Sequence, residues 1–577
     1  MVFHKVTPGG VGRRLVPNIF DVAALVLVTG LLVLIAYGVD QADAPLATLP
    51  TRTISLDPWL LPQYALRTTL RMLTAMVWSL VFTFVYATLA AKSRRAEMVL
   101  IPLLDVLQSV PILGFLTFTV VFFMGLFPGR VLGAELASVF AIFTSQAWNM
   151  TFSMYQSLRS LPKDLEEVSS SFHLSWWQRF WHLDVPFAMP GLVWNAMMSM
   201  SGGWFFVVAS EAITVGDTSV VLPGIGSYVA TAIDQQNLAA IGWAVLSMLV
   251  IIIAYDQLLF RPIVAWADKF RVEQTASGEA PDSWVLDLFR RTRALRAVTL
   301  FASNGLRAIG RLSLPLPRLP RPALRLALPE QLVDGAWRVI LVVATVWIGS
   351  EIVRFVGANL GLSDVAEAFG KGLLTLLRVS VLIAIASLVW VPIGVWVGLR
   401  PRIAQKVQPL AQFLAAFPAN IAFPAAVMLI VHAKLDPNIW LSPLMILGTQ
   451  WYILFNVIAG TTAFPSDLKE AAASLHLKGW RWWKTVMLPG VFPYYVTGAI
   501  TASGGSWNAS IVAEAASWGN HSLTATGLGS YIAAATAAGD FPRVVLGIAV
   551  MSIFVTLTNR LVWRPLYGFA ERRLRIS

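Results

Sequence analysis

The chain has 577 residues, of which 57% are hydrophobic and only 13% are charged, and its formal net charge is +12. Soluble domains carry about 25% charged residues, so this composition excludes a soluble protein and indicates a polytopic helical membrane protein. In such a protein a basic balance reflects lysine and arginine retained on the cytoplasmic side, and it gives no reason to expect nucleic acid. Cysteine is absent, which excludes disulfides and cysteine-ligated metal or haem sites.

Apolar runs in chain order predict the membrane helices. The first run, residues 19–39, precedes Ala42-Asp43-Ala44, which resembles a signal-peptidase site. Signal-peptide cores measure about 7–15 residues, so we expect this longer run to be a retained helix, with cleavage as the alternative. The later runs lie near residues 68–91, 98–126, 133–158, 188–212, 238–261, 336–356, 371–399, 407–431, 438–460, 490–514 and 541–563. Because a helix satisfies its own backbone hydrogen bonds in lipid, we predict an all-α polytopic membrane protein with about 12 transmembrane helices.

The two halves of the chain repeat one pattern. The residues that recur 303 positions later include Trp204, Glu211, Gly224, Gly226, Tyr228, Arg261 and Pro262, and three upstream residues recur 307 positions later. Six helices is an even number, so the second half enters the membrane from the same side as the first and the repeat is parallel. We therefore predict a first transmembrane domain over residues 1–262, a basic cytoplasmic linker over 263–335 and a second transmembrane domain over 336–577.

Basic residues indicate the orientation. They cluster after the second and eighth predicted helices, at 92–95 and 400–406, and again at 572–575. The positive-inside rule places these segments, both termini and the linker in the cytoplasm. The linker has eight arginines between 291 and 325 with no acidic residue among them. We interpret it as a tether attracted to anionic lipid, with a regulatory or nucleic-acid surface as the alternative.

Two polar stretches, residues 164–186 and 467–489, interrupt the apolar runs at the 303-residue offset. Each begins with acidic residues, which suit a helix N-terminus, and continues with bulky aromatic residues of the kind that dominate interfaces. A single copy would fit an amphipathic connection that packs on its own bundle, but two copies in matched register on the cytoplasmic side favour recognition of a partner.

These stretches resemble the EAA loops of binding-protein-dependent ABC importer permeases, the cytoplasmic segments that dock on the ATPase. The resemblance covers nearly the whole chain, as two fused permease domains. It implies that coupling to the ATPase rests on Glu166, Glu167, Ser171, His173, Trp177, Pro186, Glu470, Ala471, Ala472, His476, Trp480 and Pro489.

The loops depart from the family pattern at two points. Residues 470–472 keep the Glu-Ala-Ala sequence of the family, whereas residues 167–169 read Glu-Val-Ser. Both copies replace the family glycine by histidine, at His173 and His476. Glycine there makes a sharp turn that can demand a positive φ, and histidine is among the residues enriched in that conformation. We expect the turn to persist, with pH sensing as the alternative role.

The ends of the two repeats narrow the resemblance. The sequence Gly224-Ile-Gly226-Ser-Tyr228, followed by Phe260-Arg-Pro262, and its counterpart in the second half resemble the nitrate/sulfonate/taurine group of permeases. That group implies a small anion as solute and a periplasmic or surface solute-binding protein as partner. Fused ferric-iron permeases share the double architecture and are the alternative.

Motifs for ATP hydrolysis are missing from the chain. No Gly-x-x-x-x-Gly-Lys-[Ser/Thr] sequence occurs, so the chain cannot build a phosphate-cradling loop. We expect ATP and magnesium to be used on two separate ABC ATPase subunits, one for each loop. The chain itself is predicted to be a transport subunit rather than an enzyme, with no cofactor, catalytic residue or metal site of its own.

Polar and aromatic residues within the predicted helices are candidates for a solute pathway. They are Asn149, Trp204, Glu211, Asn456, Trp507 and Glu514. For the two glutamates the alternative is a carboxylate that reaches water at a helix end, and for the asparagines it is hydrogen bonding between helices. Arg71 and Arg378 either attract an anion or extend to the membrane surface, as arginine near a helix end commonly does.

The predicted function is the transmembrane subunit of an ATP-driven importer in a bacterial inner membrane. ATP closes the ATPase pair, the loops move together, and the two halves rock to exchange outward and inward access. A secondary transporter of six plus six helices is one competing class, but it requires coupling charges at mid-membrane, which are scarce here. A signalling module whose loops recruit a sensor protein is another.

Overall fold

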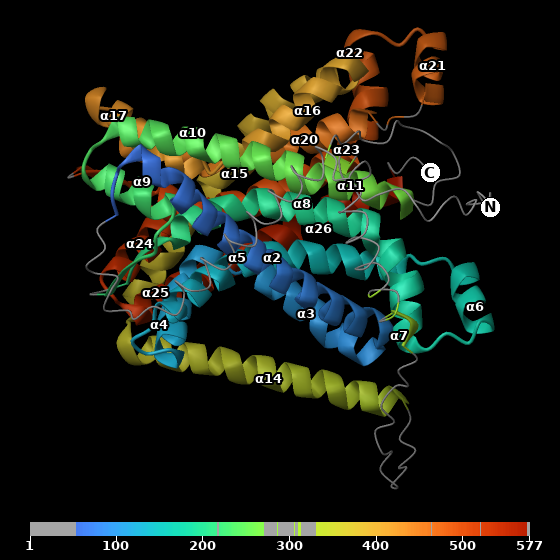
Figure 1. Cartoon of the computed structure of the whole chain (residues 1–577), viewed down its shortest axis with the longest axis horizontal. Helices are drawn as coiled ribbons and strands as arrows, with labels where there is room; N and C mark the ends of the chain where they lie inside the picture. Colours follow the sequence, from blue (N-terminus) through green and yellow to red (C-terminus); the bar gives the residue numbers. More distant parts are fainter. Residues whose placement is uncertain are drawn as a thin grey trace, which may run out of the picture. The chain divides into compact units, whose positions relative to one another are not determined.

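The computed structural model describes residues 54–270 and 330–573, except 216–217, 463, 465 and 520, together with positions 285, 286, 305, 308 and 310–312. The first predicted helix and most of the predicted linker lie outside the described residues. The described chain is almost entirely helical (Figure 1), which confirms the predicted all-α fold.

Helices of the first half alternate with short 3-10 and π turns, labelled η. In chain order the elements are η2 Pro58–Leu60, α2 Leu61–Lys92, α3 Arg94–Ser109, α4 Ile112–Leu126, α5 Val131–Arg159, α6 Lys163–Ser171, α7 Trp176–Arg179, η3 Phe180–Asp184, α8 Val185–Ser210, β1 Ala212–Val215, β2 Thr218–Val221, α9 Ile225–Asp234, α10 Leu238–Tyr255, η4 Asp256–Phe260, α11 Arg261–Ala267 and η5 Asp268–Phe270.

The second half has a similar order, except that several shorter elements, η6 to α20, stand where the first half has α4 and α5. Its elements are α14 Glu330–Asn359, α15 Leu362–Gly398, α16 Pro401–Ala416, η6 Ala419–Ala422, α17 Phe423–His432, α18 Pro437–Trp440, α19 Leu444–Leu447, α20 Trp451–Thr462, α21 Ser466–Ser474, α22 Gly479–Trp482, η7 Trp483–Met487, α23 Leu488–Ala513, β3 Ala515–Trp518, β4 His521–Thr524, α24 Leu528–Ala537, α25 Phe541–Thr558, η8 Asn559–Trp563 and α26 Arg564–Arg573.

The repeat holds residue by residue. From α6 to η4, every element of the first half begins and ends 303 positions before its counterpart, from α21 to η8. The offset of 307 applies to α3 and α16. Even the π turns recur, since η3 matches η7 and η4 matches η8. The duplication inferred from a few matched residues therefore extends to the backbone of the whole second part of each half.

Long apolar helices are present, but fewer than twelve are seen in the described ranges. There, seven helices are long and apolar enough to cross a membrane, or up to nine if each of two bent pairs is one span. The predicted run 98–126 is divided at Pro111, and the run 407–431 bends by 78° next to Pro418. Proline removes a backbone donor and disfavours the helical conformation in the residue before it. A polytopic protein is confirmed, and the count of about 12 stays a prediction.

The described residues gather in two compact units that do not follow the sequence halves. One unit contains residues 161–190 with the described positions of 255–321. The other contains the described residues of 54–160, 191–254 and 330–573. The first predicted loop thus belongs to one unit and the second to the other.

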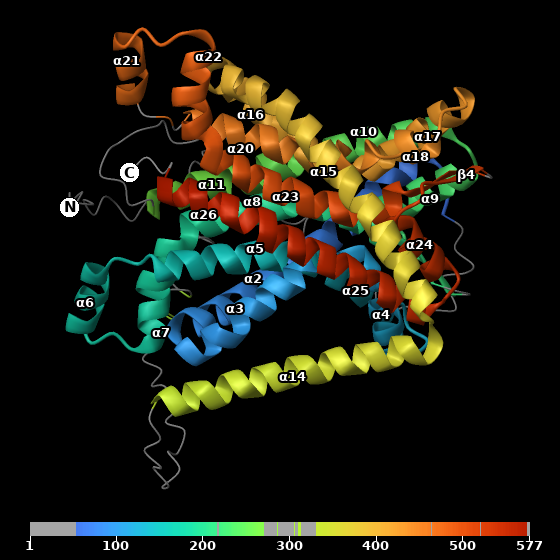
Figure 2. The ribbon, with the colours of Figure 1, turned by 180° about the vertical axis from the view of Figure 1, so that it is seen from behind.

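Within the larger unit the two halves pack directly against each other. Helices α3 and α4 contact α25, and α4 also contacts α23 and α24 (Figure 2). The Ile112 N–H donates a hydrogen bond of 2.7 Å to the Asn508 side-chain oxygen. The rings of Phe118 and Phe541 lie 5.7 Å apart between centroids.

The two β-hairpins add a second contact between the halves. Strands β1 and β2 pair antiparallel with Ala212 opposite Val221, and β3 and β4 pair in the same register. Strand β1 contacts α24 of the second half, and β3 contacts α9 of the first. At the turn of the second hairpin, the Gly519 N–H donates to the Ile233 carbonyl at 3.1 Å. Each hairpin therefore contacts a helix of the opposite half.

Candidate coupling loops and buried arginine–glutamate networks

The first predicted loop folds as two short helices, α6 and α7, joined by a tight turn. The His173 N–H donates to the Ser170 carbonyl at 3.0 Å, and the Leu174 N–H donates to the Ser169 carbonyl at 3.3 Å. This bonding pattern is the Schellman motif, which places the residue after the helix in the left-handed region. His173 has a φ of 49°, in agreement with the motif.

The second loop has the same geometry. The His476 N–H donates to the Ala473 carbonyl at 3.0 Å, and the Leu477 N–H donates to the Ala472 carbonyl at 3.0 Å. His476 also has a φ of 49°. The prediction that histidine sustains a glycine-type turn is therefore confirmed in both copies.

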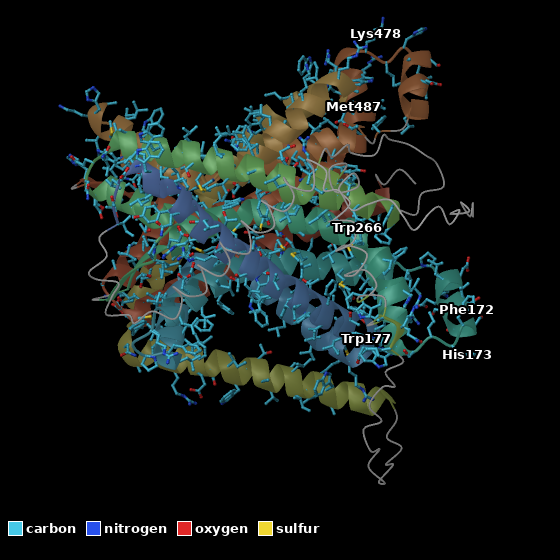
Figure 3. All side chains as sticks on the ribbon, in the orientation of Figure 1. Phe172, His173, Trp177, Trp266, Lys478 and Met487 are labelled. Carbon is cyan, nitrogen blue, oxygen red and sulfur yellow. The ribbon has the colours of Figure 1, made fainter. Side chains whose placement is uncertain are left out.

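Both turns present an apolar side chain to the outside. Phe172 is 72% exposed and Leu475 is 71% exposed. Figure 3 shows Phe172 and His173 at the tip of the first loop. Other predicted coupling residues on the exposed surface are Glu167, Ser171, Glu470 and Ala471, whereas Ala472 is buried.

Charged side chains of the first loop bond within the loop itself. Arg179 pairs with Glu166 and lies 3.7 Å from Asp184, measured from Nε to Oδ1. Ser175 and Gln178 form a capping box, in which the Gln178 N–H donates to Ser175 Oγ at 3.3 Å and the Ser175 N–H donates to Gln178 Oε1 at 3.0 Å. These contacts fix α7 at its N-terminus and tie it to α6.

The aromatic residues differ between the loops. Trp177 packs with Phe180 and Trp181, whose ring centroids lie 6.1 and 5.7 Å away. Its counterpart Trp480 is 72% exposed. A π turn follows the aromatic residues in each loop, and the half-buried prolines Pro186 and Pro489 begin the next long helices.

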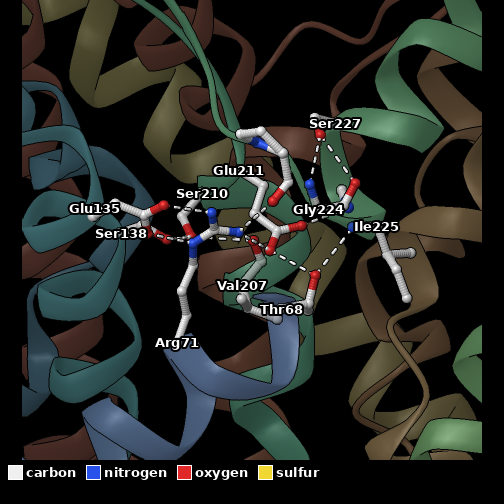
Figure 4. A network of polar contacts seen from close by, with 12 residues as sticks. Thr68, Arg71, Glu135, Ser138, Val207, Ser210, Glu211, Gly224, Ile225 and Ser227 are labelled. Carbon is white, nitrogen blue, oxygen red and sulfur yellow. Dashed lines mark hydrogen bonds and ion pairs between the residues drawn. The ribbon is translucent and has the colours of Figure 1, made fainter. Parts of the chain in front are cut away.

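A buried ion-pair network lies at the end of α8 (Figure 4). Arg71 on α2 donates to both oxygens of Glu135 at 2.6 and 2.7 Å and to Glu211 at 2.6 Å. Thr68 donates to the same Glu211 oxygen at 2.7 Å, and the Gly226 N–H donates to the other at 2.6 Å. Arg71 is 4% exposed and Glu211 is fully buried. This bonding satisfies the buried charges, as interior charges require.

The same network recurs at the end of α23. Arg378 donates to Glu514 at 3.0 Å, Thr375 donates to it at 2.9 Å, and the Gly529 N–H donates to it at 2.7 Å. The position of Glu135 is occupied by Asn438, which lies 3.5 Å from Arg378. Among the described residues, the second arginine therefore has one carboxylate partner and the first has two.

Glycines make this close packing possible. A Cβ atom added to Gly224 would overlap the carboxylate of Glu211, and one added to Gly527 would overlap that of Glu514. The carboxylates thus lie against the N-termini of α9 and α24, where the helix dipole favours a negative charge. The glycines of the Gly-x-Gly-Ser-Tyr sequences thus leave the space in which these glutamate side chains lie.

The candidate pathway residues lie within the helical bundle. Trp204 and Trp507 are each 1% exposed, and Asn149 is half-buried on α5. The Asn456 side chain donates to the carbonyl of Tyr452 in its own helix at 2.8 Å. Their role in a pathway remains a prediction.

Two alternative interpretations from the sequence are wrong. The carboxylates of Glu211 and Glu514 do not reach water, because both are buried and bonded to an arginine. Arg71 does not extend to the membrane surface, because two glutamates hold it inside the protein. Thr68 and Thr375 were not predicted as site residues, although their spacing of 307 positions matches that of the two arginines and marks them as a pair.

The described residues contain no cluster of three or more histidine or acidic side chains suited to a metal ion.

Comparison with known proteins follows the same division into halves. The sequence model of the family described as "Binding-protein-dependent transport system inner membrane component" matches residues 83–260 and 390–575, more than half of the chain.

Three relatives show the range of similar proteins. The nitrate import permease protein of Leptolyngbya laminosa is 26% identical over 246 residues, which cover 43% of this chain and 78% of the relative. The bicarbonate transport system permease protein of Synechococcus elongatus is 29% identical over 146 residues, covering 25% of this chain and 51% of the relative. The glycine betaine/proline betaine transport system permease protein of Escherichia coli is 27% identical over 223 residues, covering 38% and 58%.

Proposed function

We propose that this chain, which belongs to the family of binding-protein-dependent transport system inner membrane components, forms the whole solute pathway of an ATP-driven importer. The chain is a multi-pass transport protein with two fused copies of the family domain. One chain then supplies both halves of the pathway. Both of its termini and both loops face the cytoplasm in this proposal.

The observation that carries the proposal is the pair of loops at matched positions. Each is a helix, a left-handed histidine turn and a second short helix, with an exposed apolar side chain at its tip. A short amphipathic helix that lies in a groove of another protein is a common mode of recognition. Two such loops in one chain support docking to two ATPase subunits.

The partners follow from the family and from what the chain lacks. No phosphate-binding loop motif occurs in the sequence, so hydrolysis of ATP falls to the ATPase subunits and this chain acts as a transport subunit. A solute-binding protein delivers the solute to the outer face. Receptor binding and ATP binding then favour the same closed state, because coupling between two binding events is reciprocal.

The proposed solute is a small anion. Relatives from Leptolyngbya laminosa and Synechococcus elongatus are named as nitrate and bicarbonate permeases, and the glycine motif of the sequence resembles the nitrate/sulfonate/taurine group of permeases. A relative named for betaines gives the contrasting possibility. Proteoliposomes that contain the complete transporter would be assayed for ATP-dependent uptake of nitrate, bicarbonate and glycine betaine. Uptake of betaine alone would overturn the anion assignment and leave the importer function in place.

Coupling through the loops is tested by co-purification. The tagged wild-type chain and the double variant Glu167→Arg/Glu470→Arg would be isolated in mild detergent with the co-expressed ATPase. We expect about two ATPase copies with the wild type, one for each loop, and a loss of ATPase from the variant, because both replaced residues are exposed on the loops. If no ATPase accompanies the wild-type chain, the loops have another role and secondary transport becomes the better explanation.

A further inference from the structure

The two loops differ on one corresponding face of their second helix. In the second loop Lys478 is the residue directly before α22, Arg481 lies on α22 and Lys484 lies on η7, so the three residues are spaced three positions apart. Residues at this spacing lie on one side of a helix. All three side chains are exposed, and no ion pair to them occurs among the described residues. Figure 3 shows Lys478 at the outer end of the loop.

The corresponding face of the first loop is already covered. Its residues are Ser175, Gln178 and Trp181, none of which carries a charge. The Gln178 side chain donates to the carbonyl of Arg311 in the linker at 3.1 Å. Gly310 lies against the same face, since a Cβ atom added to it would lie 3.4 Å from Trp181. The linker of the same chain therefore covers this face of the first loop.

The exposed face of the second loop has a positive charge that complements an acidic partner. Trp480, which precedes Arg481 in the chain, is 72% exposed. Exposed tryptophan and arginine are the residues that most often anchor protein interfaces. Complementary charge adds specificity and speeds association. The counterpart Trp177 packs against its own loop instead.

We propose that Lys478, Arg481 and Lys484 form a basic docking face, with Trp480 as its anchor, for an acidic groove on one ATPase subunit. The first loop docks its ATPase without such a face because the linker segment at residues 310–312 takes that place. The two docking sites thus differ in composition: one presents basic side chains of the loop itself, and the other presents the linker segment that includes Arg311. This inference rests on the proposed coupling role of the loops and names the surface chemistry of the partner.

Charge reversal tests the docking face against a matched control. The test variant is Lys478→Glu/Arg481→Glu, and the control is Arg402→Glu/Lys406→Glu on α16, where both side chains are also exposed. Each tagged chain would be purified with its ATPase, identified by the peptide of its phosphate-binding loop. We expect the test variant to lose at least half of the bound ATPase, and the loss to be reproduced by high salt in the wild type. The control keeps the wild-type amount.

Retention of two ATPase copies by the test variant would overturn the inference. The basic face would then serve another purpose, and a drop in co-purified anionic phospholipid would assign it to the membrane surface. A wild-type chain without any ATPase would instead refute the proposed function itself.

Photo-crosslinking gives a second, independent readout. A photoreactive residue at Arg481 is expected to join the chain to an ATPase peptide rich in aspartate and glutamate. The same residue at Gln178 is expected to join the loop to the linker of its own chain, near Arg311. An ATPase adduct at Gln178, or a neutral or basic ATPase peptide at Arg481, would contradict the inequality of the two sites.

Discussion

Removal of either buried arginine should destabilise the protein, and the first should cost more. Replacing Arg71 by methionine deletes three hydrogen bonds to carboxylates, of 2.6, 2.7 and 2.6 Å, and leaves the fully buried Glu211 without its cation. Breaking a buried pair by removing one partner costs about 3–5 kcal/mol. Arg378 makes one such bond, of 3.0 Å, and is 14% exposed. Its loss leaves one carboxylate without its cation where the loss of Arg71 leaves two, so it should cost about 3 kcal/mol, the lower end of the same range.

The assay is the midpoint of thermal unfolding in detergent, followed by size-exclusion chromatography of the heated protein. We expect the midpoint to fall more for Arg71→Met than for Arg378→Met. Adding Glu135→Gln to Arg71→Met should restore part of the loss, because one unpaired carboxylate is then removed. Equal midpoints for wild type and Arg71→Met, or a larger fall for Arg378→Met, would refute the reasoning.

Three further predictions concern backbone positions. Gly224→Ala should lower the unfolding midpoint, because the added Cβ would overlap a buried carboxylate. The control Gly242→Ala has open space at that atom and should leave the midpoint unchanged or raise it. Equal effects of the two substitutions would contradict this prediction. His476→Gly should keep the amount of co-purified ATPase unchanged. His476→Val should reduce it, because a β-branched residue tolerates the left-handed conformation poorly. A valine variant that retains the wild-type amount of ATPase would show that the turn is dispensable for docking. Gly519→Leu would collide with Gln236 of the opposite half and should speed proteolysis between the halves, whereas an unchanged digestion rate would argue against a hairpin contact in solution.

The sequence predicted those features that depend on local pattern. Matched residues at a fixed offset gave the duplication, and the enrichment of histidine at positive φ gave the conformation of His173 and His476. Polar interruptions in an apolar chain likewise located the two loops, because such interruptions do not depend on long-range packing.

Features that depend on distant contacts were not accessible in the same way. Glu135 lies 64 residues from Arg71, and nothing local marks it as the partner of a buried arginine. The burial of Glu211 depends on a glycine that lies beyond a hairpin, so a helix-end position looked compatible with water. The bends near Pro111 and Pro418 were visible as prolines, but whether a proline ends a helix or only kinks it is decided by tertiary packing.

The matched π turns are a further feature that the two halves of the chain share. A π turn holds one residue more per turn than the surrounding α-helix and is rare in proteins. Both halves have such turns at two pairs of corresponding positions. Such matched insertions are expected of two copies of one domain. The two copies also differ, since Glu135 of the first half corresponds to Asn438 of the second. Two identical subunits made from one gene must accept every substitution twice, whereas the joined chain could alter one arginine site and keep the other.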